Sequence, residues 1–335
     1  MGIYRKDILR HKIMKLIITI DTEEDNWGDY NCKGHTLKNI ERIPLLQQLF
    51  DDFNVKPTYL ISYPVATDKR AVSIFKKIVG EDKCEIGTHC HPWNTPPFEE
   101  ERTEYNSMLC NLPADLQFRK IKYLHDTIRN NSGVEPVSFR AGRWGYNQNV
   151  AKNLYKLGYK IDTSVTPFTN WREDHGPEFT NLSPRPFRFS SEDIFHESEG
   201  GEMLEVPVTI GFLQRNFTLC NSILQLTVQR PVSYLRIPGI FHKLNLINKV
   251  WLCPEGYGSR SMIGLAKSMM RNNFGIINMM FHSPALIHGL TPFVKTKDEE
   301  KRFFDRIREF LRFASDTGIE SIRLSESLQY YNNKG

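Results

Sequence analysis

Two histidines stand one residue apart in the stretch EIGTHCHPW, at positions 89 and 91, and the same spacing separates Asp21 from Glu23 in TIDTEED. In extended chain, residues i and i+2 point to the same side. One carboxylate and two imidazoles on adjacent strand ends can bind Zn²⁺ or a similar divalent ion and leave a position for water. We therefore predict a metal site formed by His89, His91 and one carboxylate of the pair Asp21 and Glu23. His91 is the safer of the two histidines, because the rigid dipeptide PW follows it.

Three more stretches place polar side chains directly after an apolar run: FRAGRWG with Arg140, IDTSVTP with Asp162, and MMFHS with His282. Taken singly, each of these residues has an ordinary structural explanation, such as an ion pair or a buried polar group. Five such endings in one chain are not easily explained by solvated loops. In barrels of parallel strands the chemistry gathers at the C-terminal strand ends, so we expect these side chains to converge.

The elements that must position these residues alternate between strand-like and helix-like segments. Strands are predicted at 15–21, 56–62, 83–89, 137–142, 159–165, 203–211 and 275–283, and helices at 37–53, 68–80, 114–133, 147–158 and 297–318. Such alternation is typical of a parallel sheet with helical crossovers. Seven or eight units over this length favour an α/β barrel over an open sheet, with irregular insertions at 167–202 and 212–258.

The N-terminal part of the chain and the segment 234–251 give further expectations. Residues 1–13 are predicted to be an extension before one domain at 14–330, since Met14 can serve as the natural start. The run LIITI is too short for a signal peptide, and no stretch approaches the roughly 20 apolar residues of a membrane span. The segment 234–251 mixes cationic and apolar residues. A helix packed on the barrel is favoured there over one that lies on a membrane surface.

Composition limits the classes of partner. The net charge of +5 on 335 residues is mild, so nucleic acid is not required as a partner, whereas an anionic glycan or lipid surface is not opposed. The six cysteines contain no CxxC pair and no dense framework. That pattern favours a reduced, cytoplasmic environment, with the inner membrane surface as an alternative place within it.

The five stretches, in this order, resemble the motifs of the polysaccharide deacetylases, the NodB-homology domains of carbohydrate esterase family 4, and in particular the branch often labelled WalW-like. The resemblance covers roughly residues 15–325. It implies a distorted parallel (β/α)7-type barrel and metal-dependent removal of acetyl groups from N-acetylated sugars. The substrate would belong to a surface or cell-wall polysaccharide or to its precursor, either free or lipid-linked.

Carried over by position, the resemblance makes Asp21 the general base and Arg140 the residue that orients it. Asp162 would tune His282, the imidazolium general acid. These residue types suit amide hydrolysis, in which a base takes a proton from water and an acid delivers one to the departing amine. A carboxylate beside the imidazole favours its protonated form.

The chain departs from the family pattern at two positions. Thr22 stands where the pattern has a metal-binding aspartate, so Glu23 must take over that role. Trp93 stands where the second histidine would fall, and His91 is present instead. These departures leave open a metal-free hydrolase of non-peptide C–N bonds on the same barrel, or a catalytically inactive glycan-binding homologue.

The remaining expectations concern cofactor and substrate. One divalent ion is expected, with zinc the first choice and cobalt, nickel or iron as alternatives. Trp93, Arg143 and Trp144 are predicted to bind the sugar, with backbone N–H groups around Trp144 as oxyanion donors. A retaining glycosidase ranks low, because Asp21 and Glu23 on one strand do not flank a sugar ring from two faces.

Overall fold

The computed structural model describes residues 14–25, 27–28, 30, 34–228 and 246–332. The extension predicted for residues 1–13 and most of the amphipathic segment at 234–251 lie outside these residues. In the part of the chain that is described, no helix combines the length and the apolar character that crossing a bilayer requires.

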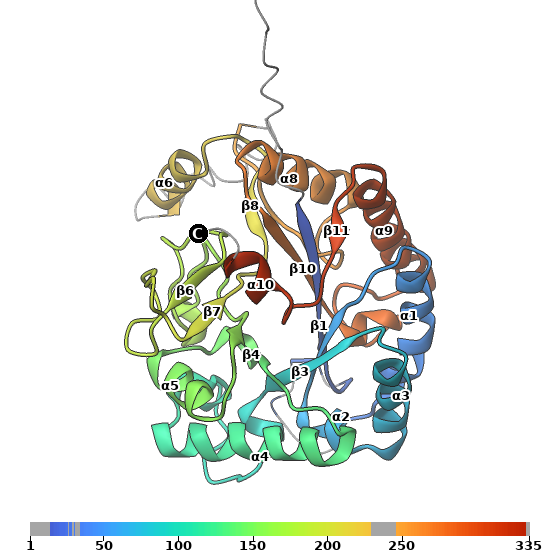
Figure 1. The fold of residues 1–335 in the computed structure, drawn as a ribbon, viewed down its shortest axis with the longest axis vertical. Coiled ribbons are helices and arrows are strands. Elements are labelled where there is room, and N and C mark those ends of the chain that lie inside the picture. Colours follow the sequence, from blue (N-terminus) through green and yellow to red (C-terminus); the bar gives the residue numbers. More distant parts are fainter. Residues whose placement is uncertain (1–13, 26, 29, 31–33, 229–245, 333–335) are drawn as a thin grey trace, which may run out of the picture.

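One curled, mostly parallel sheet forms the centre of the molecule (Figure 1). Its strands follow the order β10-β1-β2-β3-β4-β5-β7-β6, and β11 pairs with β1. Every neighbouring pair is parallel except β6 and β7. The strands are β1 Lys15–Thr22, β2 Thr58–Ile61, β3 Glu85–Cys90, β4 Ser138–Ala141, β5 Ile161–Asp162, β6 Phe187–Phe189, β7 Met203–Glu205, β10 Ile276–His282 and β11 Glu320–Ser321.

A seam lies beside the edge strand β10, where single hydrogen bonds join this strand to the segments that follow β7 and β9. The N–H of Thr209 donates to the carbonyl of Asn278 over 3.0 Å, and the N–H of Leu252 donates to the carbonyl of Thr209 over 2.8 Å. The N–H of Met280 donates in turn to the carbonyl of Leu252 over 3.1 Å. The prediction of a distorted barrel is confirmed, and the distortion lies at this seam.

Most of the helices surround the curled sheet, whereas α10 lies near the middle of the view and packs against residues of several strands (Figure 1). The helices are α1 Ile43–Asp51, α2 Tyr63–Thr67, α3 Lys69–Gly80, α4 Ala114–Ser132, α5 Gln148–Lys156, α6 Phe217–Val228, α8 Ser259–Arg271, α9 Lys297–Asp316 and α10 Ser327–Asn332. Short 3-10 helices occupy Lys38–Arg42, Pro92–Asn94, Tyr105–Ser107, Leu109–Asn111, Gly142–Trp144, Arg172–Asp174 and Ser283–Leu286. Local sequence sets several starts: Asp68 caps α3, Asn147 caps α5, and Thr296 and Glu299 form a capping box on α9.

Two predicted elements differ from the structure, each near a proline. The helix predicted at 37–53 is a 3-10 helix at Lys38–Arg42 and becomes α-helical only from Ile43, where Pro44 lies in the first turn of α1 and its missing N–H costs nothing. The strand predicted at 203–211 is divided into β7 and a separate strand β8, Ile210–Phe212. Pro207 lies between them and cannot donate to a ladder. β8 instead pairs antiparallel with β9, Lys249–Trp251, in a two-stranded sheet.

Burial of β1 explains its sequence. All eight residues of KLIITIDT are buried, as expected for a parallel strand covered on both faces. Its neighbours β2 and β10 fix its register, so that Asp21 lies opposite Leu60 on one side and His282 on the other. The end of β1 is therefore held rigidly at the point where its polar residues begin.

Candidate active site

The predicted convergence of strand ends is present in the structure. Asp21 is in register with His282, and His89 is in register with Arg140, so four of the predicted residues come from neighbouring strand ends. A cavity of about 460 Å³ opens over these ends, and its lining includes Asp21, Glu23 and His282. The cavity is therefore the candidate active site.

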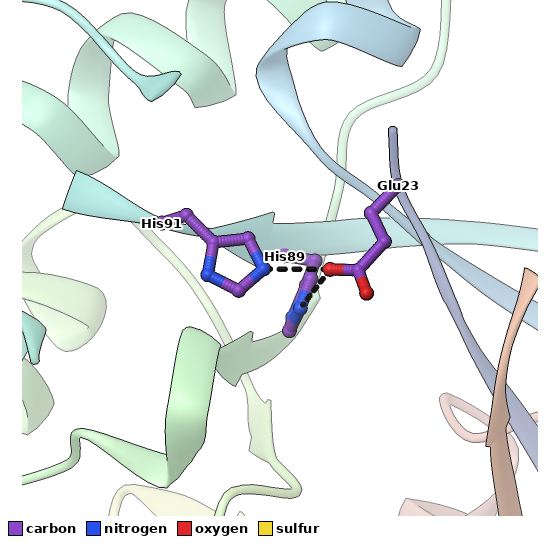
Figure 2. Close-up of side chains that lie close together, drawn as sticks. All are labelled: Glu23, His89 and His91. Carbon is purple, nitrogen blue, oxygen red and sulfur yellow. Dashed lines mark hydrogen bonds and ion pairs between the residues drawn. The ribbon is translucent and has the colours of Figure 1, made fainter. Parts of the chain in front are cut away.

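Glu23, His89 and His91 form the cluster shown in Figure 2. Glu23 Oε2 lies 2.7 Å from Nε2 of His91 and 3.4 Å from Nε2 of His89. One ligand atom from each residue lies within 4.8 Å of the others, and all three residues are buried. In the part of the chain that the structure describes, this is the one group of histidine, cysteine or carboxylate side chains with the spacing of a metal site.

Charge and hydrogen bonding prepare this cluster for a cation. Burial alone would raise the pKa of Glu23, but hydrogen bonds to both histidines outweigh it and hold that pKa well below its ordinary value. Burial and the neighbouring His89 lower the pKa of His91, which favours the neutral imidazole that binds metals. Burial also opposes the charged form of His89, but the carboxylates of Asp21 and Glu23 raise its pKa.

A hydrogen bond outside the cluster fixes the tautomer of His89. Its Nδ1 lies 3.2 Å from the carbonyl of Arg140, which can only accept, so Nδ1 carries a proton and Nε2 is the nitrogen that faces the cluster. This is the usual arrangement of a histidine ligand, whose second nitrogen donates to a carbonyl or carboxylate. The residues present therefore fit one divalent ion.

Gly142 makes room for His91 and was missed by sequence reasoning. A Cβ added to Gly142 would lie 2.1 Å from Nδ1 of His91. That nitrogen is buried and has no hydrogen-bond partner among the described residues. The position of the His91 ring therefore depends on the close approach of the backbone at Gly142, a requirement that only the glycine in FRAGRWG signals in the sequence.

Arg140 is fully buried and holds Asp21. Its guanidinium donates to Oδ1 of Asp21, to Oγ1 of Thr19 at 2.7 Å and to the carbonyl of Thr163 at 3.0 Å. Burial alone would raise the pKa of Asp21, but the positive charge of Arg140 outweighs it and lowers that pKa. Asp21 is thus an ionised carboxylate, and its second oxygen, Oδ2, lies 3.6 Å from Nε2 of His282.

The partner of His282 differs from the predicted one. His282 Nδ1 donates to Oε2 of Glu255 over 3.0 Å, so Glu255 lies where Asp162 was expected. Burial alone would lower the pKa of His282, but the charge of Glu255 and its hydrogen bond, together with Glu23 and Asp21, raise it to about 9. The imidazole is therefore protonated at neutral pH.

Asp162 lies in the wall of the barrel, away from the role that was predicted for it. Its carboxylate accepts hydrogen bonds from the N–H and the hydroxyl of Ser164, at 2.9 and 2.8 Å, and it shares a hydrogen bond with Glu205, its register partner on β7. The prediction that Asp162 contacts His282 is wrong, because β5 pairs with β4 and β7 while Glu255 reaches His282 from the seam.

Glu255 follows β9, in a segment that the sequence left hard to interpret. The carbonyl of Pro254 accepts a hydrogen bond from Arg306 on α9 over 2.8 Å, which helps to fix this segment. One signal could have identified Glu255: it is the only acidic residue between Glu205 and Asp298. An isolated acid in a long basic and apolar stretch needs a specific partner.

All five tryptophans of the chain line the cavity: Trp27, Trp93, Trp144, Trp171 and Trp251. Trp93 and Trp144 were predicted. Of the other three, Trp27 and Trp171 lie in loops and Trp251 ends β9, and the sequence does not reveal that their side chains face the cavity. Trp93 packs on the His91 ring at a centroid distance of 4.0 Å, so it also supports a candidate ligand. The cavity is therefore mainly aromatic around its charged centre.

Arg143, the third predicted sugar-binding residue, also lines the cavity. Its guanidinium lies 4.5 Å from the centroid of the Tyr30 ring and donates to the hydroxyl of Ser107. Arg143 and Trp144 both adopt left-handed backbone conformations, with φ of 53° and 62°. Two consecutive non-glycine residues in that region are uncommon, and such strain gathers at functional sites.

Comparison with known proteins identifies the fold. No protein-family model and no curated protein matches the chain. Among solved structures, the chain is similar to a protein assigned as a glycoside hydrolase or deacetylase from Parabacteroides distasonis, with a TM-score of 0.61 and 12% identity over 97% of this chain and 73% of that one. It is also similar to a protein assigned as a polysaccharide deacetylase from Mycobacterium smegmatis, with a TM-score of 0.55 and 16% identity over 97% and 92% of the two chains.

A 4-alpha-glucanotransferase from Thermococcus litoralis matches as well, with a TM-score of 0.50 and 14% identity. The match covers 95% of this chain and 40% of that protein. At these identities the likeness is one of fold. The predicted resemblance to the polysaccharide deacetylases is confirmed at that level. Because the same fold also carries a glucanotransferase, the function has to be argued from the site.

Proposed function

We propose that this protein is a metal-dependent hydrolase that removes acetyl groups from N-acetylated sugars. The observation that carries the proposal is the pairing of an ionised base with a protonated acid beside a cluster of metal-ligand type. Asp21 Oδ2 lies 3.6 Å from His282 Nε2 and 3.9 Å from His89 Nε2. Amide hydrolysis needs both functions at one carbon, one for the attacking water and one for the departing nitrogen.

Glu23, His89 and His91 would hold the divalent ion, with zinc the first choice for a set of two imidazoles and one carboxylate. When bound, such an ion lowers the pKa of water and polarises a carbonyl. Three protein ligands leave a position open for water, as in catalytic sites of this type. Zinc, cobalt, nickel and iron all accept this donor set.

The chain's own residues would move the protons. Asp21 accepts the proton of the attacking water, and Arg140 keeps its carboxylate ionised and oriented. His282 is charged because of Glu255, and it delivers a proton to the nitrogen as the C–N bond breaks. Without this proton the leaving group would be an amide anion, which is far too basic to depart.

The lining of the cavity supports a saccharide as the substrate. Sugar rings present C–H faces that pack on flat aromatic side chains, and five indoles surround this cavity. The fold shared with polysaccharide deacetylases agrees with that choice. We propose a surface or cell-wall polysaccharide or its precursor as the substrate, and a cytoplasmic enzyme, as the cysteine usage predicts.

One experiment separates this proposal from its two alternatives. Protein purified without chelator is assayed for bound metal and for acetate release from a panel of N-acetylated oligosaccharides, before and after chelation and zinc re-addition. We expect about one bound ion per chain and a release of acetate that chelation stops and zinc restores. Full activity without metal would favour the metal-free hydrolase. A bound ion with no acetate from any saccharide would favour the inactive glycan-binding homologue.

A further inference from the structure

Two large aromatic side chains stand exposed at the rim of the cavity. Trp27, in the loop after β1, is 37% exposed, and Phe293, in the loop that precedes α9, is 43% exposed. Their rings meet edge to face with centroids 5.4 Å apart, and both line the cavity. Trp93 and Trp144, in contrast, are buried. A paired apolar surface left in water beside a charged centre is a feature of ligand-binding sites.

This pair is attached to the proton donor of the reaction. The Trp27 ring lies 4.7 Å from the His282 ring, at 87° to it. His282 uses Nδ1 for Glu255 and directs Nε2 toward Asp21. Any atom that receives the proton of Nε2 must come within about 3 Å of it. The group bonded to that atom then lies within reach of Trp27.

The proton of His282 goes to the nitrogen, so the group beside Trp27 is the amine half of the substrate and not the acetyl half. We propose that Trp27 and Phe293 form a platform, the rim platform, that binds the apolar face of the sugar unit whose amide is cleaved. This inference rests on the proposed function, because it takes its orientation from the direction of proton transfer. It adds to that function an assignment of which half of the substrate the rim binds.

The contact between Trp27 and His282 also has a purely structural interpretation, in which the indole only holds the imidazole in place. The two interpretations predict different kinetics. A platform residue contributes to substrate binding, so its loss raises KM and leaves kcat nearly unchanged. A residue that only supports His282 acts on proton transfer, so its loss lowers kcat or moves the pH profile.

The test uses Trp27→Ala, Trp27→Phe and Phe293→Ala in the full-length, zinc-loaded protein. Tyr155→Ala serves as the matched control, since Tyr155 is an exposed aromatic residue on α5 that does not line the cavity. Calorimetry measures the dissociation constant of the trisaccharide of N-acetylglucosamine, and acetate release gives kcat and KM. Binding in the Asp21→Asn background avoids turnover during the titration.

We expect Trp27→Ala and Phe293→Ala each to weaken trisaccharide binding by about 3- to 10-fold, the scale of one aromatic contact. Trp27→Phe should lie between Trp27→Ala and the parent protein, and kcat and the alkaline limb of the pH profile should not move. Unchanged binding in both alanine variants, no trisaccharide binding by the parent protein, or a lower kcat at constant KM would each overturn the platform.

The same data separate the platform from the proposed function. Binding that depends on Trp27 without any acetate release would support a sugar contact at the rim, but it would contradict the deacetylase and with it the assignment of the bound half of the substrate. Acetate release together with wild-type trisaccharide binding in both alanine variants would support the deacetylase and contradict the platform.

Discussion

Glu255 Oε2 lies 3.0 Å from Nδ1 of His282, and this contact lies at the seam of the barrel. His282 ends β10, whereas Glu255 belongs to the segment that follows β9. The carboxylate fixes the ring so that Nε2 points toward Asp21, and its charge favours the imidazolium form. The acid function of the site therefore depends on a residue outside the parallel sheet.

Glu255→Gln is expected to move the alkaline limb of the pH–rate profile to lower pH. Burial alone lowers the pKa of His282, and Glu255 is the main cause that raises it to about 9. Without that charge the imidazole loses its proton at lower pH, by about 1 to 3 units, the range an adjacent opposite charge produces. NMR titration of the His282 ring measures the same shift directly.

Asp162→Asn is the matched control for this prediction, since it also removes one buried carboxylate but lies in the barrel wall. Its alkaline limb should stay in place. A limb that moves in Asp162→Asn and not in Glu255→Gln would return the tuning role to Asp162.

Asp21→Asn and Glu23→Gln are expected to separate the base from the metal ligand. Asp21→Asn keeps the shape of the side chain and removes the proton acceptor, so turnover should fall by about 10²- to 10⁴-fold while metal content stays nearly intact. Glu23→Gln should lower metal occupancy instead, because the amide carries no charge. Metal analysis and acetate release on both variants test the two roles. If Asp21→Asn loses its metal while Glu23→Gln keeps it, the assignments must be exchanged.

Gly142→Ala is expected to weaken metal binding without any change to a ligand. The new methyl group would lie 2.1 Å from Nδ1 of His91, so the ring or the backbone must move. Loss of support behind a ligand typically lowers metal affinity by about 10- to 100-fold. Competition with a chelating dye measures this change. Gly80→Ala, where the added Cβ meets nothing within 4 Å, is the control and should bind zinc as the parent protein does.

Glu205→Gln is expected to flatten the dependence of stability on pH. Burial raises the pKa of Glu205 well above its ordinary value, and that of Asp162 rises as well. A raised pKa in the folded state means stability that is present at acidic pH and is lost as pH rises from the ordinary carboxyl range through the raised value. The glutamine amide can donate to Asp162 as the protonated acid does. Thermal melts across pH test this. An equally steep loss of stability with rising pH in Glu205→Gln would contradict a protonated acid hydrogen bond between Glu205 and Asp162.

The sequence predicted the parts of the site that depend on local pattern. The end of β1 in TIDTEED and the end of β3 in EIGTHCHPW follow from short apolar runs with polar ends, and the parallel pairing of both strands with β2 then brings these ends to the same edge of the sheet. The alternation of strands and helices was enough to predict the barrel. The i, i+2 spacing correctly indicated that His89 and His91 would point to the same side, and in the structure both lie close to Glu23.

The parts that the sequence did not predict depend on contacts between distant segments. Glu255 reaches His282 only because the seam admits a segment from outside the sheet. Asp162 was misassigned because strand order, which makes Glu205 its neighbour, cannot be read from the polarity of a strand end. The direction of Trp27 and Trp171 depends on loop conformation, for which the sequence carries no periodic signal, and that of Trp251 depends on the pairing of β9 with β8.

The seam has a consequence for how the pH dependence of this site can change in evolution. The candidate ligands and Asp21 lie at the ends of β1 and β3, which both pair with β2, so the parallel sheet fixes their positions. Glu255 is carried by a segment joined to the barrel through isolated hydrogen bonds, such as that from Leu252 to Thr209. The working pH of the acid can therefore be altered by replacing that segment while the ion site is inherited unchanged. Selection can therefore act on the proton donor and on the ion site separately.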